Sequence, residues 1–278
     1  MQRCFFWLSG ILIILLLSWF IIRILGDGLP YLTSKFIFGK PQEIMAGGGV
    51  GPQLFNSFYI LALSLLFSLP IGLGAGIYMA VYAKQNKFTD FIRVSVEALS
   101  SVPSIVLGLF GYLLFANLMG LKFSILGGAA TLSLLNLPIL VRVTEESIRS
   151  VPGSYWEASL ALGSTKWQSI LKVLIPSSLP GLITGVTLVA GRALGETAIL
   201  IYTAGLSVSR HFPDFNPLTM GETLSVHLWY IQSEAIVPDA KQIAKGSAAL
   251  LLIIVLIFNL LVGIPSRILQ KKRLSGGN

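Results

Sequence analysis

Six runs of nearly uninterrupted apolar residues dominate the 278-residue sequence. A helix needs about 20 apolar residues to cross the roughly 30 Å hydrocarbon core of a bilayer, and every run is close to that length or longer. Charged residues make up only 12% of the chain, whereas soluble domains carry roughly 25%. The sequence therefore predicts an all-α polytopic membrane protein whose six transmembrane helices cover Phe5–Leu25, Leu54–Tyr82, Val94–Met119, Phe123–Val141, Ser177–Gly205 and Gly246–Ile264.

The first run has the position of a secretory signal peptide, and Arg3 precedes it. Its apolar core is longer than that of a signal peptide, and no A-x-A cleavage site follows it. We therefore expect an uncleaved helix in contact with membrane lipid.

The net charge of +8 raises the question of nucleic-acid binding, but nearly all charges lie between the apolar runs. Because Lys and Arg resist translocation, the loops that are richer in them stay in the cytoplasm. We therefore expect both termini on the cytoplasmic side of the membrane, and no nucleic-acid partner. The seven basic residues of the opposite loops are Arg23, Lys35, Lys40, Lys122, Arg210, Lys241 and Lys245. The twelve on the cytoplasmic side are Arg3, Lys84, Lys87, Arg93, Arg142, Arg149, Lys166, Lys172, Arg267, Lys271, Lys272 and Arg273.

Cofactor chemistry has little support in the sequence. Cys4 is the single cysteine, and His211 and His227 stand apart in a polar loop, so no Cys/His cluster has the spacing of a metal site. The chain also lacks the G-x-x-x-x-G-K-[ST] string that cradles nucleotide phosphates. We expect no cofactor and no metal in this chain, and no catalytic residues.

Glycine pairs at four-residue spacing occur in the apolar runs. Small residues one turn apart let helix backbones approach closely in lipid, where packing replaces the hydrophobic effect. The sequence thus predicts close helix contacts at Gly72/Gly76, Gly181/Gly185 and Gly191/Gly195.

The cytoplasmic stretch 142–176 is too long for a tight connection and has its own helical pattern. Ser154 suits the N-cap of a short helix, because Glu157 follows three residues later as in a capping box. Gly163 suits the end of that helix, since glycine adopts left-handed backbone angles without steric cost. A second short helix is predicted over Thr165–Val173. Tyr155 and Trp156 are expected to be exposed, which favours docking in a groove of another protein.

The same stretch resembles the EAA loop of ATP-binding-cassette (ABC) importer permeases. Glu157-Ala158-Ser159-x-x-x-Gly163, nine residues and Val173-x-Ile175-Pro176 keep the spacing of the family pattern. The resemblance implies a type I ABC importer permease fold. It divides the chain into an N-terminal helix and outer loop, 1–53, and a five-helix core, 54–278, that carries the loop. The resemblance also implies that Glu157, Ala158 and Gly163 couple the chain to an ATPase subunit.

Two opposite charges interrupt the fifth run. A charged residue at mid-bilayer costs at least about 2.5–3.5 kcal/mol on insertion scales, and such residues usually mark pairs or pathways. Arg192 and Glu196 are four residues apart, which would place them on one helical face, able to pair. They could lock two helices together, or they could line a path for a substrate.

The string from Arg192 to Ala204 resembles the R-x-x-GETAPLLFTA signature of the PstA-type permeases of bacterial phosphate importers, with Ile199 in place of the usual proline. The resemblance implies a path for inorganic phosphate along Arg192, Glu196 and Thr197. A guanidinium binds an oxyanion by two parallel hydrogen bonds, which makes Arg192 the first candidate to contact the anion. Arg142 is a second candidate for this role or an ordinary cytoplasmic anchor. The implied partners are a sister permease, two ATPase subunits that bind the ATP, and an extracytoplasmic phosphate-binding protein.

Other functions stay open at this point. The same machine could carry another oxyanion such as phosphonate, molybdate or sulfate, because one Arg–Glu pair suits many anions. An ion-coupled secondary transporter would also have six spans and buried charge, but it has no use for the long cytoplasmic loop. An intramembrane enzyme is disfavoured because no Ser/His or metal constellation lies in the runs.

Overall fold

A computed structural model of the chain describes residues 2–42, 45–234 and 236–275. Within these ranges every regular secondary-structure element is a helix. The helices are α1 (Gln2–Gly28), α2 (Ser34–Phe38), α3 (Gly51–Ile77), α4 (Lys87–Ser101), α5 (Ser104–Gly111), α6 (Ile125–Arg149), α7 (Gly153–Ala161), α8 (Lys166–Ser169), α9 (Ile175–Leu194), α10 (Ala198–Thr203), α11 (Leu224–Ser233) and α12 (Ala240–Ser275). A 3₁₀ turn, η1 (Leu29–Tyr31), follows α1, and π-helical turns form η2 (Tyr78–Tyr82), η3 (Tyr112–Leu118) and η4 (Ile170–Leu174).

The prediction of a polytopic all-α membrane protein is confirmed. Five continuous helical stretches are long and apolar enough to cross a membrane. The bent pair α4–α5 adds a sixth span if it is counted as one. The five are Phe6–Tyr31, Gly51–Tyr82, Ile125–Arg149, Lys166–Leu194 and Ala240–Gly263.

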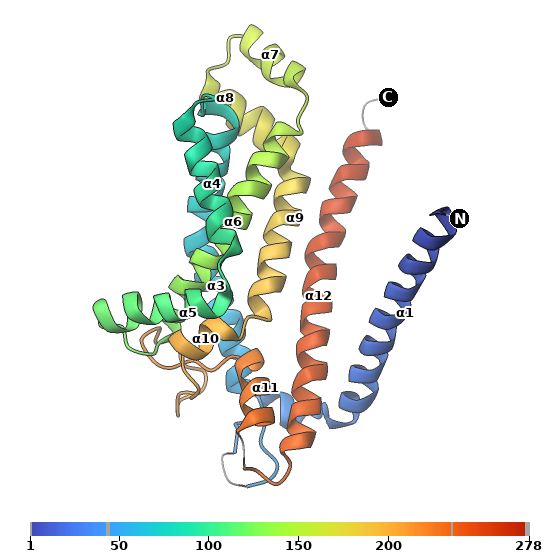
Figure 1. The fold of residues 1–278 in the computed structure, drawn as a ribbon, viewed down its shortest axis with the longest axis vertical. Helices are drawn as coiled ribbons and strands as arrows, with labels where there is room; N and C mark the ends of the chain where they lie inside the picture. The colour runs from blue at the N-terminus through green and yellow to red at the C-terminus, as the bar shows by residue number, and fades with distance from the viewer. Residues whose placement is uncertain (1, 43–44, 235, 276–278) are drawn as a thin grey trace.

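The expected third span, Val94–Met119, is not one straight helix. The stretches Lys87–Ser101 and Ser104–Leu118 meet at 98°, so that α5 projects sideways from the bundle (Figure 1). The residue before a proline is pushed out of the α region, and Val102 before Pro103 has extended angles of φ −65° and ψ 128°. The helix therefore breaks at this point.

The expected fifth span is displaced along the chain. The helix begins at Lys166, and it ends at Leu194 rather than Gly205. Pro176 has no N–H to donate, but the wider π turn η4 directly before it lets α8 continue into α9, so the predicted stop before Pro176 is wrong. Gly195 forms the C-cap of α9, and α10 starts again at Ala198.

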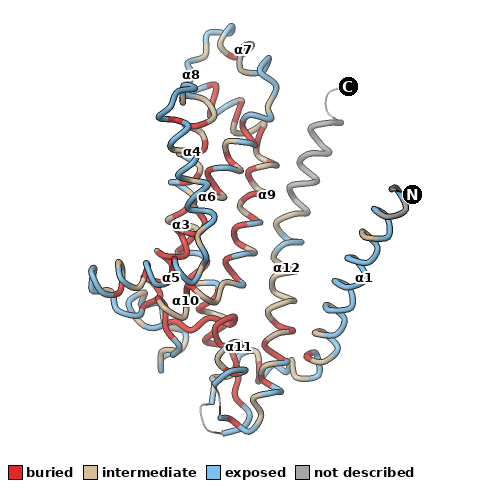
Figure 2. The backbone as a smooth tube through the Cα atoms, viewed as in Figure 1, coloured by how far each residue is buried: buried red, intermediate tan, exposed pale blue. Residues whose placement is uncertain are grey.

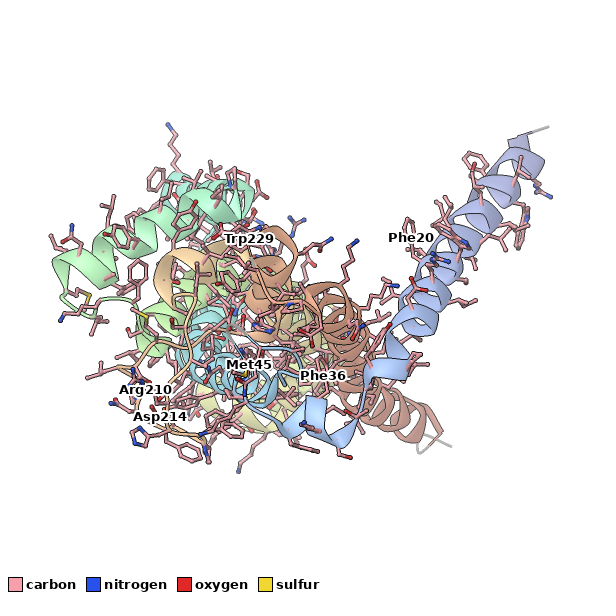
Figure 3. All side chains as sticks on the ribbon, turned by 90° about the horizontal axis from the view of Figure 1, so that it is seen from below. Phe20, Phe36, Met45, Arg210, Asp214 and Trp229 are labelled. Carbon is pink, nitrogen blue, oxygen red and sulfur yellow. The ribbon has the colours of Figure 1, made fainter. Side chains whose placement is uncertain are left out.

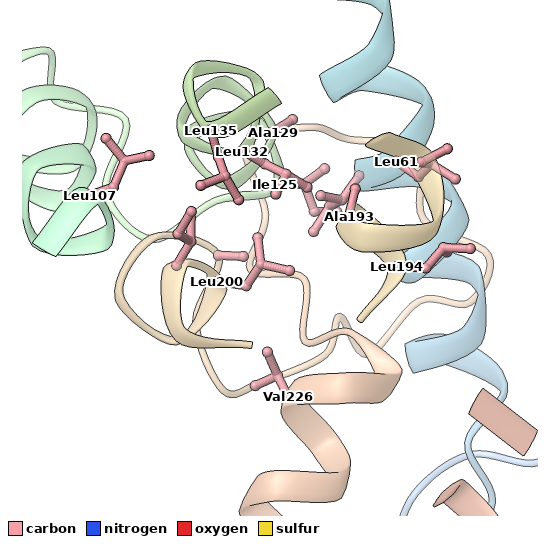
Figure 4. Packing of buried hydrophobic residues seen from close by; sticks show 14 residues of the cluster. Leu61, Leu107, Ile125, Ala129, Leu132, Leu135, Ala193, Leu194, Leu200 and Val226 are labelled. Atoms are coloured by element: carbon pink, nitrogen blue, oxygen red, sulfur yellow. The ribbon is translucent and has the colours of Figure 1, made fainter. Parts of the chain in front are cut away.

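The core lies where α3, α5, α6, α9, α10 and α11 meet (Figure 4). Ile125 and Leu132 of α6 and Leu200 of α10 are almost fully buried there. By contrast, α1 diverges from the bundle, approaching α12 near Gly28, and most of its described side chains, such as Phe20, are exposed (Figures 2 and 3). Its start, the far end of α12 and α7 lie toward one end of the molecule, the α7 end, and α11 lies toward the opposite α11 end (Figure 1).

Two of the three predicted glycine contacts join transmembrane helices closely. A Cβ added at Gly72 would lie 2.6 Å from the Leu140 side chain, and one at Gly76 would lie 2.4 Å from Thr144. Gly181 and Gly185 lie similarly against α6, whereas Gly195 meets only the backbone of its own helix. The prediction is therefore confirmed for α3 and α9 against α6. In the third pair Gly191 lies against Asn259 of α12, at 3.3 Å from an added Cβ, whereas Gly195 joins no other helix.

Replacing Gly76 by valine should weaken the bundle, because the new side chain has no room against Thr144. Overpacking of this kind costs about 1–3 kcal/mol. Gly74→Val is the matched control, since it changes helix propensity equally but meets no atom within 4 Å. The midpoint of thermal unfolding in detergent should fall clearly for Gly76→Val only. Equal midpoints for the two variants would contradict this packing.

Candidate substrate path and coupling segment

Arg192, Glu196 and Thr197 lie at the break between α9 and α10. Arg192 occupies the last turn of α9 and is exposed. Glu196 follows the end of the helix, so the two residues do not share a helical face, and no ion pair joins them in the described part of the chain. The i,i+4 pairing expected from the sequence is therefore wrong, and the positive charge of Arg192 has no anionic partner among the described residues.

Glu196 instead supports the short helix after the break. Its Oε1 accepts a long hydrogen bond of 3.5 Å from the Ile199 N–H at the start of α10. Its backbone carbonyl accepts one of 2.8 Å from the Ser225 hydroxyl of α11. The Thr197 hydroxyl donates to the Gly195 carbonyl at 3.4 Å. The break is thus held by the side chains of Glu196 and Thr197 and by the Ser225 hydroxyl of α11.

Arg142 lies at a different level of the bundle. In the antiparallel pair of α9 and α6, Gly181 faces Ser147 and Gly185 faces Val143. Arg192 therefore lies near the level of Asn136, and Arg142 lies six residues, or about 9 Å, further toward the α7 end. It is exposed and its Nε contacts Glu146 Oε1 at 3.0 Å. A cavity of about 310 Å³ adjoins it and is also lined by Arg93, Glu97, Glu145 and Arg149. The two candidate arginines therefore occupy two separate positions along the bundle and do not form one site.

The segment that resembles the EAA loop forms a helix and a turn at the α7 end. The helix begins at Gly153 behind Pro152, which provides no side-chain cap, so the predicted Ser154 cap is wrong. A capping box is present one helix later, between Thr165 and Gln168. Gly163 has φ +84°, as the sequence predicted for the end of the helix.

The two aromatic residues of this segment have different surroundings. Tyr155 is 53% exposed, as expected, whereas Trp156 packs against a small buried cluster that contains Ile148 and Ile170. Ser159, the departure from the family alanine, is buried, and its hydroxyl lies 2.8 Å from that of Ser169. This hydrogen bond ties α7 to α8. Glu157, Ala158 and Gly163 remain exposed, so they are available to another protein.

A buried polar network that the sequence does not predict lies near the α11 end. Gln53 Nε2 donates to Glu222 Oε2 at 2.8 Å, and His227 Nδ1 lies 3.1 Å from the same oxygen. All three side chains are nearly fully buried beside a cavity of about 460 Å³. His227 is part of α11, so the expectation that it is a loop residue is wrong. Within the described ranges, no group of three His, Cys, Asp or Glu side chains could hold a metal ion.

This helical architecture matches a known family of membrane proteins. The family model of binding-protein-dependent transport system inner membrane components matches residues 72–275. The chain belongs to this family. The matched range contains Arg142, Arg192 and Glu196 as well as the α7 segment, whereas α1 and Gln53 lie outside it.

Curated relatives include several permeases of this family. A probable ABC transporter permease protein, YqgI of Bacillus subtilis strain 168, is 49% identical over 85% of this chain and 84% of that protein. The phosphate transport system permease protein PstA of Haemophilus influenzae Rd is 33% identical over 91% of this chain and 88% of that protein. PstA of Xylella fastidiosa strain 9a5c is 38% identical over 65% of this chain and 63% of that protein.

Solved structures share the fold of this permease. An inward-facing form of the MetNI methionine ABC transporter matches with a TM-score of 0.61 at 21% identity, over 77% of this chain and 94% of that one. A bacterial ABC transporter that imports the acidic polysaccharide alginate matches with 0.61 at 14% identity, over 94% of this chain and 95% of that one. The type I ABC importer permease fold expected from the α7 segment is thus confirmed.

Proposed function

We propose that this chain is the permease subunit of an ATP-driven importer that moves inorganic phosphate into the cytoplasm. The observation that carries the proposal is Arg192, which is exposed at a helix break and has no anionic partner in the described chain. It stands in a string that resembles phosphate permeases, and relatives named as phosphate permeases match most of the chain.

The chemistry of the two arginines suits a passing oxyanion. The planar guanidinium of Arg192 can donate two parallel hydrogen bonds to phosphate, and each is roughly twice as strong as a neutral one. Arg142 would form a second binding position about 9 Å further along the bundle, where Glu146 competes for its guanidinium. This competition keeps the anion from being trapped, because phosphate must leave the path as readily as it enters.

The implied assembly consists of a sister permease, two ABC ATPase subunits and an extracytoplasmic phosphate-binding protein. The exposed α7 segment, with Tyr155, Glu157, Ala158 and Gly163, would seat in an ATPase subunit. ATP would be bound by that partner, since this sequence contains no P-loop string. This chain would need neither a metal nor a cofactor.

The orientation that we propose places the α7 end in the cytoplasm and the chain in the bacterial cytoplasmic membrane. The start of α1, the far end of α12 and α7 lie toward the same end of the bundle (Figure 1). That end also carries the loops with the larger share of Lys and Arg. Both termini would then be cytoplasmic.

A second candidate is the same machine with another oxyanion as its cargo, for example phosphonate, molybdate or sulfate. Two observations favour a different anion over a different transport mechanism. The name of the 49% identical relative specifies no substrate, and Ile199 replaces the proline of the phosphate-permease signature.

Deleting this chain from its host tests the proposal in the cell. We expect loss of high-affinity uptake of radiolabelled phosphate, with sulfate and molybdate uptake unchanged, and recovery when the chain is restored. Loss of uptake of another oxyanion instead would favour the second candidate. Uptake that survives ATP depletion and follows an ion gradient would indicate a secondary transporter.

A further inference from the structure

We propose that Glu145 is a positioning residue that transmits movement of α7 to the break between α9 and α10, through α4 and α5. The inference rests on the proposed function as an ATP-driven permease, but not on which anion is carried.

Glu145 joins two cationic side chains through a single atom. Its Oε1 lies 2.9 Å from Arg93 Nη2 of α4 and 2.9 Å from Arg149 Nη2 at the end of α6. The Glu145 side chain is only 15% exposed, whereas Asp90, a more distant acidic partner of Arg93 at 3.9 Å, is 68% exposed. A partly buried carboxylate shared by two guanidinium groups contributes more than an exposed pair, because its loss leaves Arg93 with only the distant Asp90 and removes the acidic partner of Arg149.

On one side this carboxylate is connected to the coupling segment. Arg149 also donates to the Met79 carbonyl of η2 at 3.3 Å. Trp156 of α7 packs on the cluster that contains Ile148, the neighbour of Arg149, and Val81 of η2. Movement of α7 therefore reaches Arg149 through packed side chains.

On the other side it is connected to the candidate path. The segment α4 is amphipathic and buries only Thr89. Among the described residues, Arg93–Glu145 is the one ion pair that joins α4 to another helix. At the 98° bend α4 leads into α5, where a Cβ at Gly108 would lie 3.0 Å from the Ile199 Cα of α10. The N–H of Ile199 is the group that Glu196 accepts from.

These contacts form a continuous mechanical connection. A shift of α7 moves Arg149 and Glu145, Glu145 pulls Arg93 and α4, and α5 then displaces the start of α10 next to Arg192. Such a chain of contacts can carry energetic coupling between distant sites when one of its elements has two arrangements. The bend at Val102–Pro103 is the joint at which α4 can change its angle to α5.

The first test is Glu145→Gln in the full importer complex, which keeps the size of the side chain and removes its charge. We expect assembly and ATP hydrolysis to persist while the amount of anion imported per ATP falls at least about fivefold. The matched control is Asp90→Asn, which removes an exposed acid from the same arginine and should leave the ratio unchanged. A merely structural role would lower complex abundance or thermal midpoint without changing the ratio, and that result would overturn the proposal.

A double-mutant cycle assigns the effect to α4. Arg93→Gln should lower the ratio as Glu145→Gln does, and the double variant should be no worse than either single variant. Additive losses would overturn the connection through Arg93.

A distance measurement separates failure of this proposal from failure of the proposed function. Spin labels on cysteines at Phe88 of α4 and Leu162 after α7, both exposed, with Cys4 replaced by serine, report the relative movement of the two segments. Because α4 follows α7, the distance between the labels should stay constant when ATP is added to the otherwise native complex and change in Glu145→Gln. Equal changes in both would overturn the proposal whichever anion is transported.

Discussion

Lysine in place of Arg192 should remove most of the phosphate uptake while the importer still assembles. Lysine keeps the positive charge but loses the planar fork, so one of two charge-assisted hydrogen bonds to the anion is lost. Such a bond contributes about 1.5–3 kcal/mol, which corresponds to at least about a tenfold loss. The measurement is the initial rate of phosphate uptake at matched membrane abundance.

Two further variants separate the path role of Arg192 from a helix lock. Arg23→Lys is the matched control, because Arg23 is also an exposed arginine of a transmembrane helix but pairs with Asp27 in α1; its uptake should be normal. Exchanging the charges at positions 192 and 196 should not restore transport, since α9 ends between them. Full activity of Arg192→Lys, or recovery in the exchanged pair, would contradict the path role.

Valine at position 163 should uncouple ATP hydrolysis from uptake. Gly163 has φ +84°, which a β-branched residue adopts at a cost of about 1–3 kcal/mol, so the turn that sets the angle between α7 and α8 would change. We expect an assembled complex that hydrolyses ATP but imports little anion. The measurement is the ratio of anion imported to ATP hydrolysed.

Gly153→Val is the control for this prediction. Gly153 opens α7, has ordinary backbone angles, and a Cβ there meets no atom within 4 Å. The same substitution at this position should therefore leave coupling intact. Normal import per ATP in Gly163→Val would show that the turn is not part of the coupling segment.

The sequence predicted the spans and the Gly163 turn because both depend on local chemistry. A run of about 20 apolar residues has few alternatives to a membrane helix, and an isolated glycine after a helix favours left-handed angles. The bend at Pro103 could not be predicted in this way, because Pro70, Pro138 and Pro180 all remain inside helices. At Pro103 the preceding Val102 adopts extended angles, and α5 then packs on α10, a contact between segments far apart in the sequence that no local pattern indicates.

Local patterns also failed to predict the contacts within the candidate site. Spacing alone placed Arg192 and Glu196 on one face, but the helix ends at Leu194 between them. The network of Gln53, Glu222 and His227 joins residues up to 174 positions apart, so no local pattern indicates it. In the segment that resembles a docking loop, the expected exposure holds for Tyr155 but not for Trp156, which packs on a buried cluster that no local pattern indicates.

The purified complex in liposomes provides the test of ATP-driven phosphate import through this chain. ATP is enclosed, phosphate-loaded binding protein is added outside, and the accumulation of radiolabelled phosphate is followed with and without unlabelled sulfate or molybdate. We predict accumulation that requires ATP, resists both competitors and is lost with Arg192→Lys. Accumulation without ATP, or ATP-dependent uptake of another oxyanion in place of phosphate, would contradict the claim.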